Sequence, residues 1–173
     1  TSFPPVGGRR MCIVTNSGGP GVLAADHAEQ LGMQLPEPSP ETRAALAEFL
    51  PAHCALRNPI DLTVEGTGED YRRVLEIMLR EYDSAVAINV NTPYMPSLPQ
   101  AQGIRAAARS SGKAVAINFM ADKTIADSLP FLQAENAPNF VTGERAVSVL
   151  AFLAAYEEGR QRGVAGPLEP PAP

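Results

Sequence analysis

The chain has 173 residues, 45% of them hydrophobic and 19% charged, which is enough for one globular domain with a buried core. Its net charge of −5 disfavours nucleic acid and anionic membranes as partners, because both select clustered Lys and Arg. No apolar run approaches the ~20 residues that span a bilayer, and Cys12 and Cys54 lack the spacing of a metal or disulfide motif, so a cytoplasmic protein without a metal site is predicted.

Strands and helices alternate along the chain. Short apolar runs predict strands, periodic apolar positions predict helices, and Gly or Pro marks where elements begin and end. In chain order the predicted elements are a strand over 10–15, helices over 20–31 and 40–50, an extended segment around Pro59, a helix over 69–82, a strand over 84–91, a helix over 100–111, a strand over 113–120, a helix over 121–136 that contains Pro130, a short strand beginning at Asn139, and a helix from Thr142 to residue 161.

This alternation predicts an α/β fold: a single doubly wound, flavodoxin-like domain with a mostly parallel sheet of about five strands in the order 2-1-3-4-5. The domain is predicted over residues 9–160, between a linker over 1–8 and a proline-rich linker over 161–173, as expected for a segment of a longer multidomain chain. Ligands of such sheets bind beyond the carboxyl ends of the strands. The loops over 15–21, 58–68 and 89–96 are expected there.

The first of these loops, "TNSGGPG", joins a strand to a helix and is unusually rich in glycine. A helix N-terminus offers free N–H groups and a partial positive charge, and glycine lets an anion approach the backbone. Gly19, Gly21 and Val22 are the expected donors. A tight turn that needs glycine only for packing is an equally open interpretation. The candidate phosphate-binding residues are Thr15, Asn16, Ser17, Gly18, Gly19, Gly21 and Val22.

Several other kinds of site are disfavoured by the residues present. The glycine loop has no following Lys, as a Walker loop requires, and lacks the spacing of a dinucleotide fingerprint. His27 lies within a predicted helix, and His53 is adjacent to Cys54, so their side chains diverge. The acidic residues near Asp61 fit a solvated loop and a helix cap better than a metal site. No catalytic residue and no metal ligand is assigned.

The motifs "RRMCIVTNSGGPGVLAAD", "SPETRAALAEFLP", "NPIDL" followed by "EDYRRVLEIML", and "GKAVAINFM" followed by "VTGERAVSVLAFL" resemble a flavodoxin-like domain of the NDP-forming acyl-CoA synthetases. This family includes relatives of succinyl-CoA synthetase and ADP-forming acetyl-CoA synthetase. The resemblance covers residues 8–156.

The resemblance implies that this chain is the second flavodoxin-like domain of such an enzyme. Its partners would be a CoA-binding domain, a phosphohistidine-bearing domain and an ATP-grasp domain, and phosphate or an acyl phosphate would be the ligand. "TNSGGPG" would form half of a cradle for the phosphohistidine. CoA and ATP or ADP are implied for the full-length protein, with none bound tightly by this chain. A candidate acyl pocket or interdomain loop comprises Asn58, Asp61, Asn91, Thr92, Pro93 and Tyr94.

The family's phosphorylated histidine segment, CoA fingerprint and ATP-grasp residues are not found in this sequence. The isolated chain is therefore expected to have no synthetase activity. Two other functions stay open from the sequence: a non-catalytic, ligand-sensing domain of a related protein acetyltransferase, and a stand-alone binding module.

Overall fold

The computed structural model describes residues 3–120 and 123–163. Four parallel strands form one sheet in the order β2-β1-β3-β4. The strands are β1 (Met11–Thr15), β2 (Ile60–Asp61), β3 (Ser84–Val90) and β4 (Ala114–Met120). The helices are α1 (Gly18–Gln30), α2 (Pro40–Ala47), α3 (Gly68–Met78), α4 (Ser97–Ser111), the 3-10 turn η1 (Lys123–Ile125), α5 (Ser128–Ala134) and α6 (Gly143–Gln161). The predicted flavodoxin-like α/β fold is confirmed.

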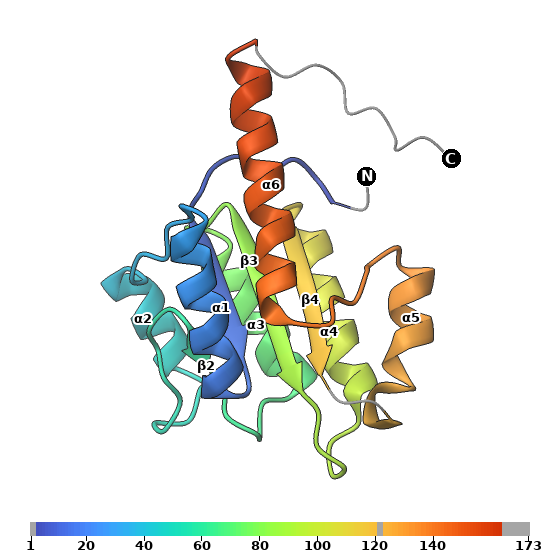
Figure 1. The fold of residues 1–173 in the computed structure, drawn as a ribbon. Helices are drawn as coiled ribbons and strands as arrows, with labels where there is room; N and C mark the ends of the chain where they lie inside the picture. The colour runs from blue at the N-terminus through green and yellow to red at the C-terminus, as the bar shows by residue number, and fades with distance from the viewer. Residues whose placement is uncertain (1–2, 121–122, 164–173) are drawn as a thin grey trace.

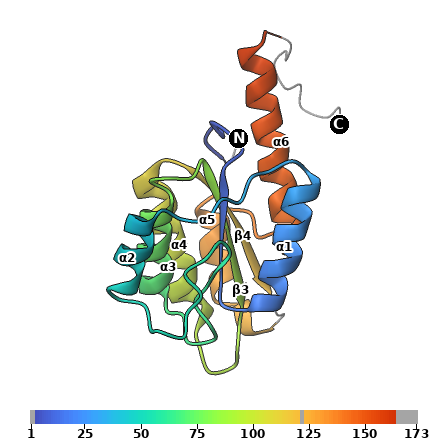
Figure 2. The same cartoon turned by 90° about the vertical axis from the view of Figure 1, so that its left-hand side faces the viewer.

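The helices form a layer on each face of the sheet. Figure 2 shows α1 and α6 on one side, and α2, α3 and α4 on the other. Each strand contributes alternate side chains to two cores, so Met11 and Ile13 face α1 and α6, whereas Cys12 and Val14 face the opposite layer. Coverage on both faces explains why β3 and β4 are continuous apolar runs in the sequence.

The number of predicted strands was wrong by one, because the fifth strand does not form in the described residues. Asn139 makes a single isolated bridge with Ile117, and its side chain then accepts a hydrogen bond from Phe119 N at 2.7 Å and donates one to Phe119 O at 3.2 Å. A side-chain amide thus caps this edge of β4 in place of a strand. Pro138, which precedes it, has no N–H to extend a ladder.

The N-terminal segment and the far end of α6 lie outside the sheet and make contacts that the sequence did not predict. Phe3 stacks on Phe140 at 6.3 Å between ring centroids, and Val6 is 1% exposed, so residues from the predicted N-terminal linker pack against the body. The far end of α6 extends past the sheet (Figure 1), where Glu158 accepts two hydrogen bonds from Arg9 at 2.6 and 2.8 Å. No helix among the described residues is long and apolar enough to cross a membrane.

Glu81, just after α3, holds the start of α2. Its carboxylate accepts hydrogen bonds from Ser39 N at 3.1 Å and from the hydroxyls of Ser39 and Thr42. These bonds hold the pKa of Glu81 below its ordinary value of 4.5, and the bond from the Ser39 hydroxyl has the largest effect.

We expect Glu81→Gln to lower the free energy of unfolding at pH 7 by about 1–2 kcal/mol, because the amide oxygen still accepts hydrogen bonds but loses the added strength that the charge gives them. A lowered folded-state pKa means that this contribution is complete above the unfolded pKa and is lost as pH falls through the folded one. Urea unfolding of both proteins should therefore converge as pH falls from the ordinary value of 4.5 through the lowered folded-state pKa of Glu81. A difference that stays constant down to pH 3 would show that the charge of Glu81 is irrelevant.

Candidate functional site

The loop between β1 and α1 leaves two backbone donors free. The Thr15 hydroxyl accepts a hydrogen bond from Ser17 N at 3.0 Å and donates one to Ser17 O at 2.9 Å. Gly21 N donates to Ser17 O at 3.3 Å, which closes the first turn of α1. Within the described chain, the N–H groups of Gly18 and Gly19 have no such partner. The helix begins at Gly18, two residues before the predicted start.

The glycines of this loop serve different purposes. A Cβ on Gly21 would lie 2.9 Å from Thr15 Cγ2 and 3.7 Å from Pro59 Cβ, so this glycine is required by packing. A Cβ on Gly19 would have no atom within 4 Å. The sequence prediction that Gly21 supplies a free donor is wrong, because its N–H is already bonded. Val22 lies a turn inside the helix, where its N–H faces the carbonyl of Gly18. Gly18 and Gly19 are thus the exposed donors.

Asn16 anchors the loop to the neighbouring strand. The residue is 5% exposed, and its side chain donates from Nδ2 to Val90 O at 3.1 Å and accepts from Val90 N at 2.7 Å. These two bonds replace a backbone pair between β1 and β3 just beyond the ladder. Asn16 therefore positions the loop, and its amide is used within the fold.

Asp61 lies beside the glycine loop, as the sequence predicted. It pairs with Thr15 in the ladder between β1 and β2, and β2 is the edge strand of the sheet, a position that suits the preceding Pro59 because proline has no N–H for a ladder. Asp61 Oδ1 accepts from Thr63 N at 2.9 Å. Asp61 Oδ2 lies 3.2 Å from the place where a Cβ on Gly18 would sit. A carboxylate thus stands at the positive end of α1, where it is stabilised by the helix and repels other anions.

Asn58 does not reach this edge of the sheet. Its side chain accepts from Ile13 N at 3.0 Å and donates to Met11 O at 2.9 Å and to Pro36 O at 3.3 Å. Two of these bonds are made to the first half of β1, and the third is made to Pro36 in the segment between α1 and α2. The structure therefore separates Asn58 from the acyl-pocket candidates with which the sequence grouped it.

The loop after β3 lines a cavity of about 300 Å³ that is open to solvent. Tyr94 at its tip is 91% exposed. The lining contains the four predicted residues of this loop and adds Thr124, which sequence reasoning missed. The only feature of the sequence that could have indicated Thr124 is its position after β4, because the carboxyl end of β4 lies at the same sheet edge. The lining residues are Asn91, Thr92, Pro93, Tyr94, Met95, Pro96 and Thr124.

The reactive side chains elsewhere have structural partners. His27 Nε2 lies 2.9 Å from Ser148 Oγ, which itself donates to Glu144 O at 2.9 Å, so the histidine is the donor of this pair. Burial raises the pKa of Cys12 to about 12, which keeps its thiol protonated. No group of three or more potential metal ligands occurs among residues 3–120 and 123–163.

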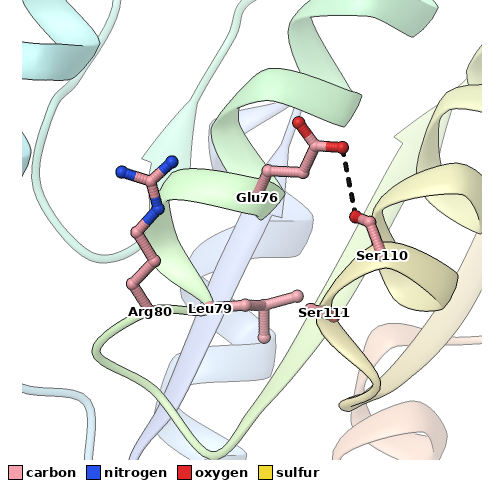
Figure 3. A pocket seen from close by; sticks show the side chains of 5 residues that line it. All are labelled: Glu76, Leu79, Arg80, Ser110 and Ser111. Carbon is pink, nitrogen blue, oxygen red and sulfur yellow. Dashed lines mark hydrogen bonds between the residues drawn. The ribbon is translucent and has the colours of Figure 1, made fainter.

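A second groove, of about 350 Å³, lies between the C-terminal halves of α3 and α4 (Figure 3). Ser110 Oγ donates to Glu76 at 3.1 Å across it, while the guanidinium of Arg80 points away. Leu79 and Ser111 complete the lining. Because these helices end where the strands begin, the groove lies at the opposite edge of the sheet from the glycine loop.

Comparison with known proteins identifies relatives over almost the whole chain. The family model described as "Ligase-CoA domain" matches residues 11–164. The chain is 33% identical over 148 residues to "Acetate--CoA ligase [ADP-forming] I" of Archaeoglobus fulgidus, covering 86% of this chain and 21% of that protein. It is 32% identical over 165 residues to "Acetate--CoA ligase [ADP-forming] II subunit alpha" of Pyrococcus furiosus, covering 92% of this chain and 36% of that subunit.

Solved structures show the same relationship. A crystal structure of a protein from Pyrococcus horikoshii OT3 has a TM-score of 0.84 and 31% identity, covering 94% of this chain and 38% of that one. The dinucleotide forming acetyl-coenzyme A synthetase 1 of Ca. Korarchaeum cryptofilum, in complex with phosphate and ADP, has a TM-score of 0.82 and 26% identity, covering 95% and 37%. The chain thus spans between a fifth and two fifths of these relatives, and the resemblance inferred from the sequence is confirmed.

Proposed function

The chain belongs to the Ligase-CoA domain family, and we propose that it is the second flavodoxin-like domain of an NDP-forming acyl-CoA synthetase. In this role the N-terminus of α1 docks a phosphoryl group carried by another domain during acyl-CoA formation. The observation that carries the proposal is the pair of free N–H groups at Gly18 and Gly19. They lie at the positive end of a 13-residue helix, where backbone donors and helix dipole both favour an anion.

The surface around the loop supports a protein partner that delivers the phosphoryl group. Four large apolar side chains before or within the first turns of α1, α3, α4 and α6 are strongly exposed, and the exposed fractions are 56% for Val22, 60% for Val64, 91% for Tyr94 and 68% for Val141. Helices α1, α3 and α4 each follow a strand of the parallel sheet and begin at one edge, so Val22, Val64 and Tyr94 lie at the sheet edge that carries the proposed phosphate site. The proposed partners are the CoA-binding, phosphohistidine-bearing and ATP-grasp domains, which would bind CoA and ATP or ADP.

Asp61 sets the strength of the proposed site. Its carboxylate stands next to Gly18 and repels free phosphate, while one helix end supplies at most ~1–2 kcal/mol of charge stabilisation. Free phosphate is therefore expected to bind with a millimolar or weaker dissociation constant. A phosphoryl group held by a partner domain is added to the site at a high effective concentration and overcomes this repulsion.

The proposal is tested by titrating the chain with inorganic phosphate at constant ionic strength and following backbone amides by NMR. We expect the Gly18 and Gly19 amides to shift at tens of millimolar phosphate. Gly19→Val crowds the anion and should abolish these shifts, whereas Gly7→Val, at an equally open position outside the loop, should leave them unchanged. Asp61→Asn keeps the acceptor for Thr63 N and removes the charge, so affinity should rise about three- to tenfold.

Two outcomes would count against phosphate docking. If the NMR signals of the Gly18 and Gly19 amides do not shift with phosphate in either the wild type or Asp61→Asn, the glycines serve packing alone. If Gly19→Val and Gly7→Val weaken the response equally, the shifts do not report binding at the loop.

A further inference from the structure

The cavity after β3 contains two polar atoms whose hydrogen-bonding capacity the described residues do not use. Asn91 is 8% exposed, and its Oδ1 has no hydrogen-bond partner in the described part of the chain. Thr124 Oγ1 is likewise shielded from water and without a partner. Both residues line the cavity. Buried polar atoms are nearly always paired, so two unpaired atoms in one cavity wall call for a partner from outside the chain.

The hydrogen bonds that Asn91 already makes determine which chemical group can bind to its free atom. Nδ2 donates to Thr124 O at 2.7 Å, which orients the side-chain amide and leaves Oδ1 as the unused atom. This oxygen can only accept, so the ligand must bring an N–H or O–H. A carboxylate or an acyl phosphate would place a negative oxygen against an acceptor. Either anion is therefore disfavoured at Asn91, within the loop that the sequence named as a candidate acyl pocket or interdomain loop.

The remaining lining determines the rest of the ligand. Pro93, Tyr94, Met95 and Pro96 offer mainly apolar surface, and no charged side chain is among the lining residues that the structure describes. Charged ligands would lose hydration without an ionic partner. Thr124 Oγ1 can donate as well as accept. A secondary amide matches both free atoms, since its N–H can bond Asn91 Oδ1 while its carbonyl accepts from the Thr124 hydroxyl.

We propose that the cavity formed by residues 91–96 and Thr124 binds a small neutral secondary amide on a short aliphatic arm. The amide satisfies Asn91 and Thr124, and the arm packs on the proline, methionine and tyrosine side chains. Both polar atoms are shielded from water, so the loop side chains have to move apart slightly to admit the ligand. This site goes beyond the proposed phosphate docking and does not depend on it.

Three matched probes test the proposal on the full chain by NMR. N-butylacetamide carries the amide, butyl acetate replaces its N–H by an ester oxygen, and butyrate is the anionic counterpart. We expect the amide to shift the Asn91 side-chain NH₂ and the backbone amides of 92–96 with a millimolar dissociation constant. The ester should bind at least about fivefold more weakly, and butyrate should cause no shift.

Variants locate the binding on the named atoms. Thr124→Val removes the hydroxyl at nearly constant volume and should weaken amide binding at least about threefold, while Thr124→Ser should restore it. Gly19→Val should leave amide binding intact, which separates this site from the phosphate loop. Equal affinity for amide and ester would overturn the proposal, as would the absence of shifts in residues 91–96 at 50 mM N-butylacetamide (about 50 times a millimolar dissociation constant). The probe series uses the wild-type chain, so it stays decisive even if a variant fails to fold.

Discussion

Replacing Gly103 with alanine is expected to lower the free energy of unfolding by more than about 3 kcal/mol, or to prevent folding. A Cβ at this position of α4 would lie 1.9 Å from Gly68 O and 2.7 Å from Gly68 C. Gly68 is equally confined, because a Cβ there would lie 2.1 Å from Pro99 O. All these neighbours are backbone atoms, so relief requires that α3 and α4 move apart and disturb the core beneath them.

Chemical denaturation of Gly103→Ala beside Gly19→Ala provides the measurement and its matched control. Both changes add one methyl group to a helical glycine, but a Cβ on Gly19 has no atom within 4 Å. Gly19→Ala should therefore stay within about 1 kcal/mol of the wild type. A cost below about 1 kcal/mol for Gly103→Ala would mean that the two helices are not in backbone contact in solution.

The parts of the fold set by local pattern were predictable, and those set by long-range contact were not. The apolar runs around Val86 and Ala116 identified parallel strands, because a strand covered on both faces has no polar side. The helices predicted over 40–50 and from Thr142 begin within one residue of the expected starts, and the side chains of Ser39 and Thr142 accept a hydrogen bond from the first turn. The backbone contact at Gly103 could not be predicted in this way, because nothing in the neighbouring sequence shows that a second helix crosses there.

For the candidate site too, the sequence predicted which loops come together but not the individual contacts within them. Parallel topology alone brought the glycine loop, Asp61 and the loop after β3 to one sheet edge. The sequence could not show that Gly21 N is bonded to Ser17 O, because the helix begins two residues earlier than its apolar spacing suggests. Thr124 was missed because it is 33 residues from Asn91 along the chain, and only the fold brings them into contact. Asn58 was misplaced because a side chain, and not a strand, pairs with β1 beside Met11 and Ile13.

Asn58→Ala is expected to destabilise the chain by about 2–4 kcal/mol while leaving both proposed ligand sites intact. The substitution removes three hydrogen bonds and leaves Ile13 N and Met11 O without a partner, and both residues are 0% exposed. An unpaired buried backbone group costs more than the net value of the bond itself. Asn139→Ala, which removes two similar bonds at the other edge of the sheet, should cost less.

The function of Asn58 is decided by comparing stability with binding in the same variant. Denaturant unfolding should show the full loss for Asn58→Ala, against a change within about 0.5 kcal/mol for the exposed Gln102→Ala. In buffer, where the variant remains folded, the phosphate shifts of Gly18 and Gly19 and the amide-probe shifts of the loop after β3 should match the wild type. If binding of either probe weakened without a loss of stability, Asn58 would belong to a ligand pocket after all, and its bonds to β1 would be incidental. The expected result instead makes it the side chain that completes the pairing of β1 where β2 is too short to do so, and so keeps the glycine loop at its place on the sheet edge.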